Sequence, residues 1–199
     1  MFGLGAGLTG RSFRAGRQPT TLDPFNKTSS SVTLSNGNLT ATGTTSPYPT
    51  VRATRGASTG KKFYSVLFGA SPFQSAGVAN GAFPFDGTQP SNPDAAALYG
   101  DGTIYGNNAN IGGTGPGPVG AVCDISVDLD AKLFWARFGG GNWNFSGSAN
   151  PATGVGGINV SFLGSGTVYP IFGPYDGAHT VNFGSSAYTH AAPSGFENW

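Results

Sequence analysis

Residues 119–138 read VGAVCDISVDLDAKLFWARF, and their first part alternates between apolar and mostly polar side chains. The apolar set is Val119, Ala121, Cys123, Ile125, Val127 and Leu129, and the set between them is Gly120, Val122, Asp124, Ser126, Asp128 and Asp130. A period of two is typical of a half-buried antiparallel strand. We expect residues 130–132 to turn the chain and residues 133–138 to return as a second strand. Because neither strand can bury its apolar face alone, the pattern predicts a second sheet that covers it.

The rest of the sequence is typical of one all-β domain with many turns. The 199 residues include 34 glycines, 14 prolines and 15 phenylalanines, so short apolar runs are separated by turn residues while core material is plentiful. The strongest turn signal is Asn36-Gly37, since both residues tolerate positive φ, and it predicts a hairpin over residues 32–42. Further strands are expected over residues 51–54, 61–68, 77–80, 98–99, 103–105, 158–162, 168–172 and 179–183, with loops over 83–95, 107–118 and 139–157.

Charge and apolar length exclude several classes of partner. Charged residues are 10% of the chain and the net charge is +1, so the sequence carries no field that would attract nucleic acid or an anionic membrane. No apolar run approaches the roughly 18 residues of a membrane span. The single cysteine, Cys123, is expected to be a small core hydrophobe, the alternative being a reactive thiol. Such low charge suits a protein packed in an assembly.

Residues 1–22 differ from the rest of the chain and are predicted to be a flexible, basic, glycine-rich arm, with residues 23–199 as the globular domain. Three arginines stand there with no acidic residue, so residues 23–199 hold seven basic and nine acidic side chains. One interpretation is a frayed terminus. The other is an anchoring arm that orders on a partner, using apolar contacts and cations that meet an acidic surface. The anchoring residues would be Phe2, Leu4, Leu8, Arg11, Phe13, Arg14 and Arg17.

Short motifs along residues 23–199 occur in the order of a SPRY (B30.2-like) domain, which the chain therefore resembles. The motifs are NLTAT at 38–42, VRAT at 51–54, GKKFY at 60–64, GVAN at 77–80, VDLD at 127–130, YP at 169–170 and VNFG at 181–184, followed by APSGF at 192–196. In addition, NWN at 142–144 with NPATG at 150–154 is similar to the variant found in bacteriophage and prophage structural proteins.

Two positions depart from the family pattern. Asp124 stands in the central strand where glycine is usual, and the next strand ends in Ala136-Arg137-Phe138 where Lys-Asn-Gly is usual. The resemblance implies an all-β fold, a SPRY-like antiparallel two-sheet β-sandwich with an extended N-terminal arm. It also implies a non-enzymatic module that binds proteins or other ligands through loops at one end, and the phage-like variant implies a virion component.

The polar residues of the central region are candidates for metal binding or catalysis. Asp124, Asp128 and Asp130 share one strand face and could collect Ca²⁺, but turn-shaping by Asp128 and Asp130 is the favoured interpretation. His179 and His190 have no cysteine at zinc spacing and are expected at a strand start and in a surface loop. Since no nucleophile motif occurs either, we expect neither catalysis nor a metal or cofactor.

The loop over residues 139–157 is the best candidate for ligand binding. Trp143 and Phe145 would form a stacking platform, and Asn142, Asn144 and Asn150 would supply amide hydrogen bonds, a combination that suits sugars. The alternative is that Trp143 folds back to cap the sandwich. A similar but weaker set consists of Tyr99, Tyr105, Asn107 and Asn108. A protein-binding surface made from the same loops is equally compatible.

These observations favour a non-enzymatic bacteriophage virion protein, assembled in the host cytoplasm and multimeric within the particle. Its arm would dock on a capsid, portal-vertex or tail protein, as in a capsid decoration protein or head fibre. The alternative is a tail receptor-binding protein that contacts host surface glycan or protein. A cellular adaptor and a hydrolase are weaker hypotheses, because no companion domain and no catalytic motif are visible.

Overall fold

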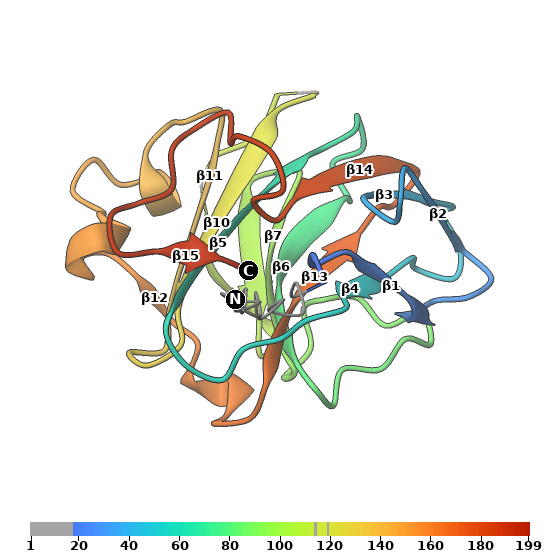
Figure 1. Cartoon of the computed structure of the whole chain (residues 1–199), viewed down its shortest axis with the longest axis horizontal. Helices are drawn as coiled ribbons and strands as arrows, with labels where there is room; N and C mark the ends of the chain where they lie inside the picture. Colours follow the sequence, from blue (N-terminus) through green and yellow to red (C-terminus); the bar gives the residue numbers. More distant parts are fainter. Residues whose placement is uncertain (1–17, 114, 119) are drawn as a thin grey trace, which may run out of the picture.

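The computed structural model describes residues 18–113, 115–118 and 120–199, and the anchoring residues predicted within 1–17 lie outside this part of the chain. Two twisted sheets pack face to face (Figure 1). The strands are β1 (Leu22–Lys27), β2 (Val32–Ser35), β3 (Thr40–Gly43), β4 (Val51–Ala53), β5 (Lys61–Leu67), β6 (Ser75–Asn80), β7 (Ala95–Tyr99), β8 (Thr103–Gly106), β9 (Ala109–Gly113), β10 (Val122–Asp128), β11 (Leu133–Phe138), β12 (Ile158–Asn159), β13 (Val168–Gly173), β14 (Gly177–Asn182) and β15 (Glu197–Asn198).

The first sheet has seven strands in the order β1-β4-β13-β6-β7-β8-β9. The second has the order β12-β11-β10-β5-β14-β3-β2, and β15 joins it by pairing with β5. That last pairing is parallel, whereas the other strand pairs are antiparallel. The predicted antiparallel two-sheet sandwich is therefore confirmed.

The central hairpin β10–β11 forms as the sequence predicts. Val127 pairs with Phe134, and the chain reverses through Lys132, whose φ is 57°. Cys123, Ile125 and Val127 are fully buried between the sheets. The alternation of residues 121–129 thus places its apolar side chains in the core, which the first sheet covers.

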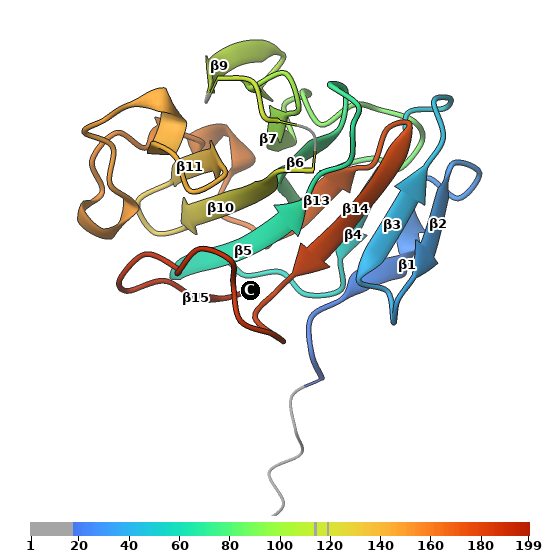
Figure 2. The same cartoon turned by 90° about the horizontal axis from the view of Figure 1, so that it is seen from above.

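The prediction that this hairpin is half-buried is wrong. Asp124 and Ser126, on the opposite face of β10, are also fully buried, and Asp128 is 7% exposed. Two segments cover this outer face: residues 139–157, and residues 184–199 with the short strand β15 (Figure 2). Their side chains Trp143, Tyr188, Ala192 and Phe196 pack on Phe63 and Trp135 of the sheet. Irregular segments therefore make a further layer of the molecule.

Three strands were not predicted. β1 contains Pro24 and an exposed phenylalanine and has a register irregularity, β9 has a single large apolar side chain, and β15 is two residues long. Each lacks the alternation that marks a half-buried strand. Residues 18–22 were assigned to the arm, yet Thr20 is buried and Leu22 lies in the core, so the sandwich begins before the predicted boundary.

The sandwich has two distinct ends. Thr180 of β14 pairs with Leu67 at the end of β5, and Ser75 at the start of β6 pairs with both Tyr99 and Gly173. The connections that follow or precede these residues therefore gather at one end, which we call the aromatic end: residues 44–50, 68–74, 100–102, 115–118 and 174–176. At the opposite end, residues 18–20 lie beside Trp199 and residues 55–57. Among the described residues, no helix is long and apolar enough to cross a membrane.

Candidate binding surface

An exposed aromatic side chain stands at the aromatic end. Phe73 is 60% exposed, and its ring packs edge-on against Tyr175 with centroids 5.5 Å apart. Tyr175 in turn packs on the buried Tyr48 at 5.2 Å. The Tyr48 hydroxyl donates to the carbonyl oxygen of Phe73, and burial raises the pKa of Tyr48 to about 12, so this hydroxyl remains a donor at neutral pH. These contacts hold the Phe73 ring in a solvent-exposed position.

The loops around Phe73 are tied to one another by backbone hydrogen bonds. The amide of Asp101 donates to Pro72 O at 3.2 Å, and the amide of Gly117 donates to Gly100 O at 3.2 Å. Gln74, fully buried, accepts from the amide of Gly69 at 2.6 Å. Loops fixed in this way present a preformed surface, which lowers the entropy cost of binding.

Two hollows flank Pro72 at this end. The first, about 310 Å³, has the side chains of Phe68, Phe138, Pro116 and Pro118 in its wall, together with Asp101. The second, about 430 Å³, is lined by Phe73 and Tyr175, together with Asp176. Among the described residues that line the two hollows, Asp101 and Asp176 are the only charged ones. Neither carboxylate makes an ion pair within the described part of the chain.

A buried charge cluster lies on the outer face of β10. The Asp124 Oδ2 accepts from Arg137 Nε at 2.9 Å, and His190 Nδ1 lies 3.0 Å from the same oxygen without the alignment of a hydrogen bond. Arg137 also stacks over the Trp143 ring at 4.2 Å. The cluster therefore joins β10 and β11 to both covering segments.

Burial dominates the electrostatics of this cluster. Removal of the Asp124 carboxylate from water raises its pKa, and the neighbouring Arg137 and His190 oppose that rise. Asp124 Oδ1 and the Ser126 hydroxyl have no hydrogen-bond partner among the described residues. Such an arrangement orders the covering segments at an electrostatic cost.

The structure places the two histidines in different surroundings. An Asp–His contact can orient a general base, but the described chain places no hydroxyl or thiol on the other ring nitrogen of His190, which lies beside Gly140. His179 was expected at a strand start. It is fully buried, stacked on Phe68 at 4.5 Å, and burial lowers its pKa to about 3. Among the described residues, no group of three or more His, Cys, Asp or Glu could hold a metal ion.

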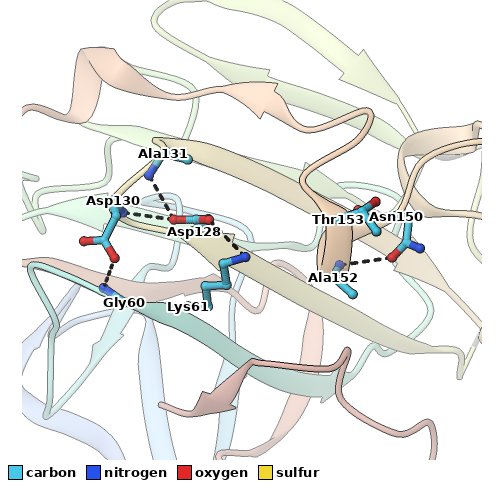
Figure 3. A network of polar contacts seen from close by, with 8 residues as sticks. All are labelled: Gly60, Lys61, Asp128, Asp130, Ala131, Asn150, Ala152 and Thr153. Carbon is cyan, nitrogen blue, oxygen red and sulfur yellow. Dashed lines mark hydrogen bonds and ion pairs between the residues drawn. The ribbon is translucent and has the colours of Figure 1, made fainter.

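Asp128 and Asp130 shape the turn, as the favoured interpretation predicted (Figure 3). Asp128 Oδ1 accepts from the amides of Asp130 at 3.1 Å and Ala131 at 2.9 Å, and its other oxygen lies 3.5 Å from Lys61 Nζ. Asp130 accepts from the amide of Gly60. The same figure shows Asn150 accepting from the amide of Ala152, which caps the single-turn helix η2 (Pro151–Thr153).

The structure separates the two aromatic residues of the predicted stacking platform, Trp143 and Phe145. Trp143 is 7% exposed and lies in the covering layer, as the capping alternative described, whereas Phe145 is 74% exposed. The Asn144 side chain bonds to the backbone of Phe134, Ala136 and Gly156. Of this set, Asn142 and Phe145 remain open to solvent, and a ligand-binding role for them stays a prediction.

The residues of the weaker candidate set for ligand binding do not all lie at one place. Asn107 and Asn108 have φ values of 51° and 60° and form the exposed turn between β8 and β9. Tyr105 lies on the outer face of the first sheet, edge-on to Tyr99 at 5.3 Å. Because β8 begins with Thr103 at the aromatic end, the turn that follows Gly106 lies at the opposite end of the strand.

Sequence reasoning missed Phe73 and Tyr175. Each is one aromatic residue in a short Pro- or Gly-containing connection, Ser71-Pro72-Phe73 and Pro174-Tyr175-Asp176-Gly177, where no periodicity assigns it to a face. The available signal was a large apolar side chain in a segment without strand pattern. Because buried residues of loops give the same signal, only the structure shows whether such a side chain is buried or exposed.

The architecture is shared with solved structures. The chain is similar to the SPRY domain of human HERC1, with a TM-score of 0.63 and 12% identity over 83% of this chain and 99% of that one. It is also similar to the TRIM65 PSpry domain, with a TM-score of 0.59 and 15% identity over 83% and 92% of the two chains. This chain has the SPRY fold.

The SPRY fold is recognised here through structure and not through overall sequence. No protein-family model and no curated protein sequence matches the chain. At 12% and 15% identity the likeness concerns the arrangement of strands. The order of short motifs over residues 23–199 nevertheless predicted the same fold. Seven of those motifs overlap strands of the two sheets, and APSGF at 192–196 lies in the segment that covers the second sheet.

Proposed function

We propose that this protein is a non-enzymatic structural component of a bacteriophage particle that binds a neighbouring protein through its aromatic end. The observation that carries the binding role is Phe73, a ring that is 60% exposed yet held by Tyr175 and Tyr48. Protein interfaces concentrate their binding energy in such aromatic anchors beside shallow pockets. The SPRY resemblance supports binding through loops at one end.

The arm supports the second part of the proposal, in which the molecule is anchored to the particle by residues 1–22. The described chain begins at the end opposite to Phe73, so anchoring there leaves the aromatic end open. The low content of charged residues, 10%, and the phage-like NWN and NPATG motifs favour a virion component such as a capsid decoration protein or head fibre. Localisation in the virion is part of this proposal.

Incorporation into particles tests the proposal. Variants of the full chain would be produced in a host that assembles the particles, and copies per purified particle would be measured by quantitative gel electrophoresis. We expect deletion of residues 1–17 to abolish incorporation and Phe73→Ser to reduce it. Phe25→Ser is the matched control, since Phe25 is 91% exposed on β1, and it should incorporate normally.

Circular dichroism of each purified variant establishes that the sandwich is folded. Normal incorporation of both the deletion and Phe73→Ser would overturn the proposal, as would absence of the wild-type protein from particles. Wild-type binding to host surface polysaccharide that is lost in Phe145→Ser would instead support the receptor-binding alternative.

A further inference from the structure

We propose that the aromatic end binds residues 1–17 of a second copy of this chain, so that copies join head to tail. The inference rests on the proposed function, which assigns protein binding to the aromatic end, and it names the partner segment. Its grounds are the charge and apolar character of the aromatic end and of the sequence of residues 1–17, and the start of the described chain at the end opposite to Phe73.

The charges of the two surfaces are complementary. Residues 1–17 carry Arg11, Arg14 and Arg17 and no acidic residue. The hollows of the aromatic end carry Asp101 and Asp176 and no basic residue among the described ones that line them. Both carboxylates are exposed and have no cation partner within the described chain. Arginine pairs with carboxylates at interfaces through a planar fork of N–H donors.

The apolar groups also correspond. Each hollow combines an apolar wall with one carboxylate, and Pro72 separates the two hollows. In the arm, Leu8 and Phe13 alternate with Arg11 and Arg14, so that large apolar side chains and cations follow one another within seven residues. A segment of this kind can place apolar anchors in neighbouring hollows while its arginines meet the rim.

The placement of the ends allows residues 1–17 of one copy to reach the aromatic end of another. Residues 18–20 lie beside Trp199, at the end of the sandwich opposite to Phe73. Seventeen residues can extend up to about 60 Å, whereas a strand of seven residues such as β5 spans about 23 Å. An arm that leaves one end can therefore reach beyond its own molecule, and a contact between unlike surfaces joins copies in a row.

A complementation experiment tests this geometry with full-length protein. The arm variant carries Arg11→Asp and Arg14→Asp, and the end variant carries Phe73→Ser and Asp176→Asn, which keeps a residue that tolerates the φ of 48° at position 176. Sedimentation velocity over a concentration series should show wild-type protein forming species larger than dimers. Each variant alone should be monomeric, and their equimolar mixture should stop at a one-to-one dimer, since one arm and one aromatic end remain intact. Phe25→Ser should behave as wild type.

A synthetic peptide of residues 1–17 gives the affinity directly. We expect it to bind the arm variant, whose aromatic end is free, and to bind the same protein with the added Phe73→Ser change at least about tenfold more weakly. Wild-type protein that stays monomeric at all concentrations, or self-association that survives in the end variant, would overturn the inference.

The two proposals fail separately. If particle incorporation depends on Phe73 while wild-type protein is monomeric and the peptide does not bind, the aromatic end binds another protein and this inference is overturned alone. If self-association depends on Phe73 while both the 1–17 deletion and Phe73→Ser incorporate normally, the inference stands and the virion role fails.

Discussion

At the scale of single residues, the two departures from the family pattern are partners. Asp124 and Arg137 lie opposite each other in the β10–β11 register and form a 2.9 Å ion pair. The sequence identified both positions, but as unrelated ones, because a register is needed to pair them. His190 was predicted in a surface loop, and only the fold brings it to the same carboxylate, from 66 residues further along the chain.

This pairing predicts a pH-dependent effect of Arg137→Met. Without Arg137 the buried Asp124 carboxylate loses its main partner, so we expect a loss of about 3 kcal/mol of unfolding free energy at pH 7. Burial already raises the pKa of Asp124, and the variant raises it further. Because the protonated acid needs no cation, the loss should shrink as the pH falls through that pKa. Urea unfolding at several pH values measures it, and a loss that does not change with pH would contradict it.

His179 predicts a second pH effect. Its ring is fully buried, neither ring nitrogen has a hydrogen-bond partner in the part of the chain that the structure describes, and burial lowers its pKa to about 3 from 6.5. The unfolded chain therefore takes up a proton that the folded chain refuses, and wild-type stability should fall as the pH drops from 6.5 toward 3. His179→Phe should weaken this acid dependence and be neutral or stabilising at pH 7, since it removes unpaired nitrogens. Thermal melts of the wild type and the variant at pH 7 and at an acidic pH below 6.5 test this prediction. An unchanged acid sensitivity of the variant would contradict it.

At the scale of elements, the strands with alternation were predictable and the covering segments were not. Residues 119–138 formed their hairpin because the pattern fixes one apolar face. The 139–157 segment was correctly expected to be a loop, yet its packing on Trp135 and Phe63 follows no period, so its burial could not be derived. The same limit hid Phe73, which lies in a connection of seven residues between β5 and β6.

The covering segment predicts a structural role for Asn144. Its side chain donates to Phe134 O at 3.1 Å and Gly156 O at 2.9 Å and accepts from the amide of Ala136. Asn144→Asp has the same size, tolerates the φ of 47° and keeps the acceptor, but loses both donations. We expect a loss of about 1–3 kcal/mol in unfolding free energy.

Asn142→Asp is the matched control, because Asn142 is exposed in the same predicted ligand set. It should leave stability unchanged in the same urea titration. Equal stability of both variants would mean that Asn144 is not part of the scaffold and would return it to the candidate ligand residues.

At the scale of the whole molecule, the two packed sheets could be predicted from the sequence. The arrangement of the connections at the two ends of the sandwich could not. Which loops meet at which end depends on strand order, and the pairing of β14 with β5 joins residues more than 110 positions apart. The aromatic end and residues 18–20 consequently lie at opposite ends of the sandwich for a reason that no local pattern contains.

Head-to-tail association predicts a dependence on ionic strength. The Arg–Asp contacts would form at exposed positions, where 1 M salt shortens the screening length from about 8 Å to about 3 Å. We expect the 1–17 peptide to bind several-fold more weakly at 1 M than at 0.15 M salt, while the part of the affinity that Phe73 contributes persists. Binding that is insensitive to salt would leave the arginines without a role.

The covering layers have a consequence for how the protein can change. Since segments lie over the outer face of β10 and β11 and are held there by Asp124, Asn144 and Trp143, substitutions of the residues that make these contacts disturb the scaffold. The outward-facing side chains of the turns around Phe73 make no contacts of this kind within the described chain. A library of random variants selected only for solubility should therefore keep Trp143 and Asn144 nearly constant and accumulate diversity around residues 70–73 and 175–176. New specificities would be gained there without loss of the fold.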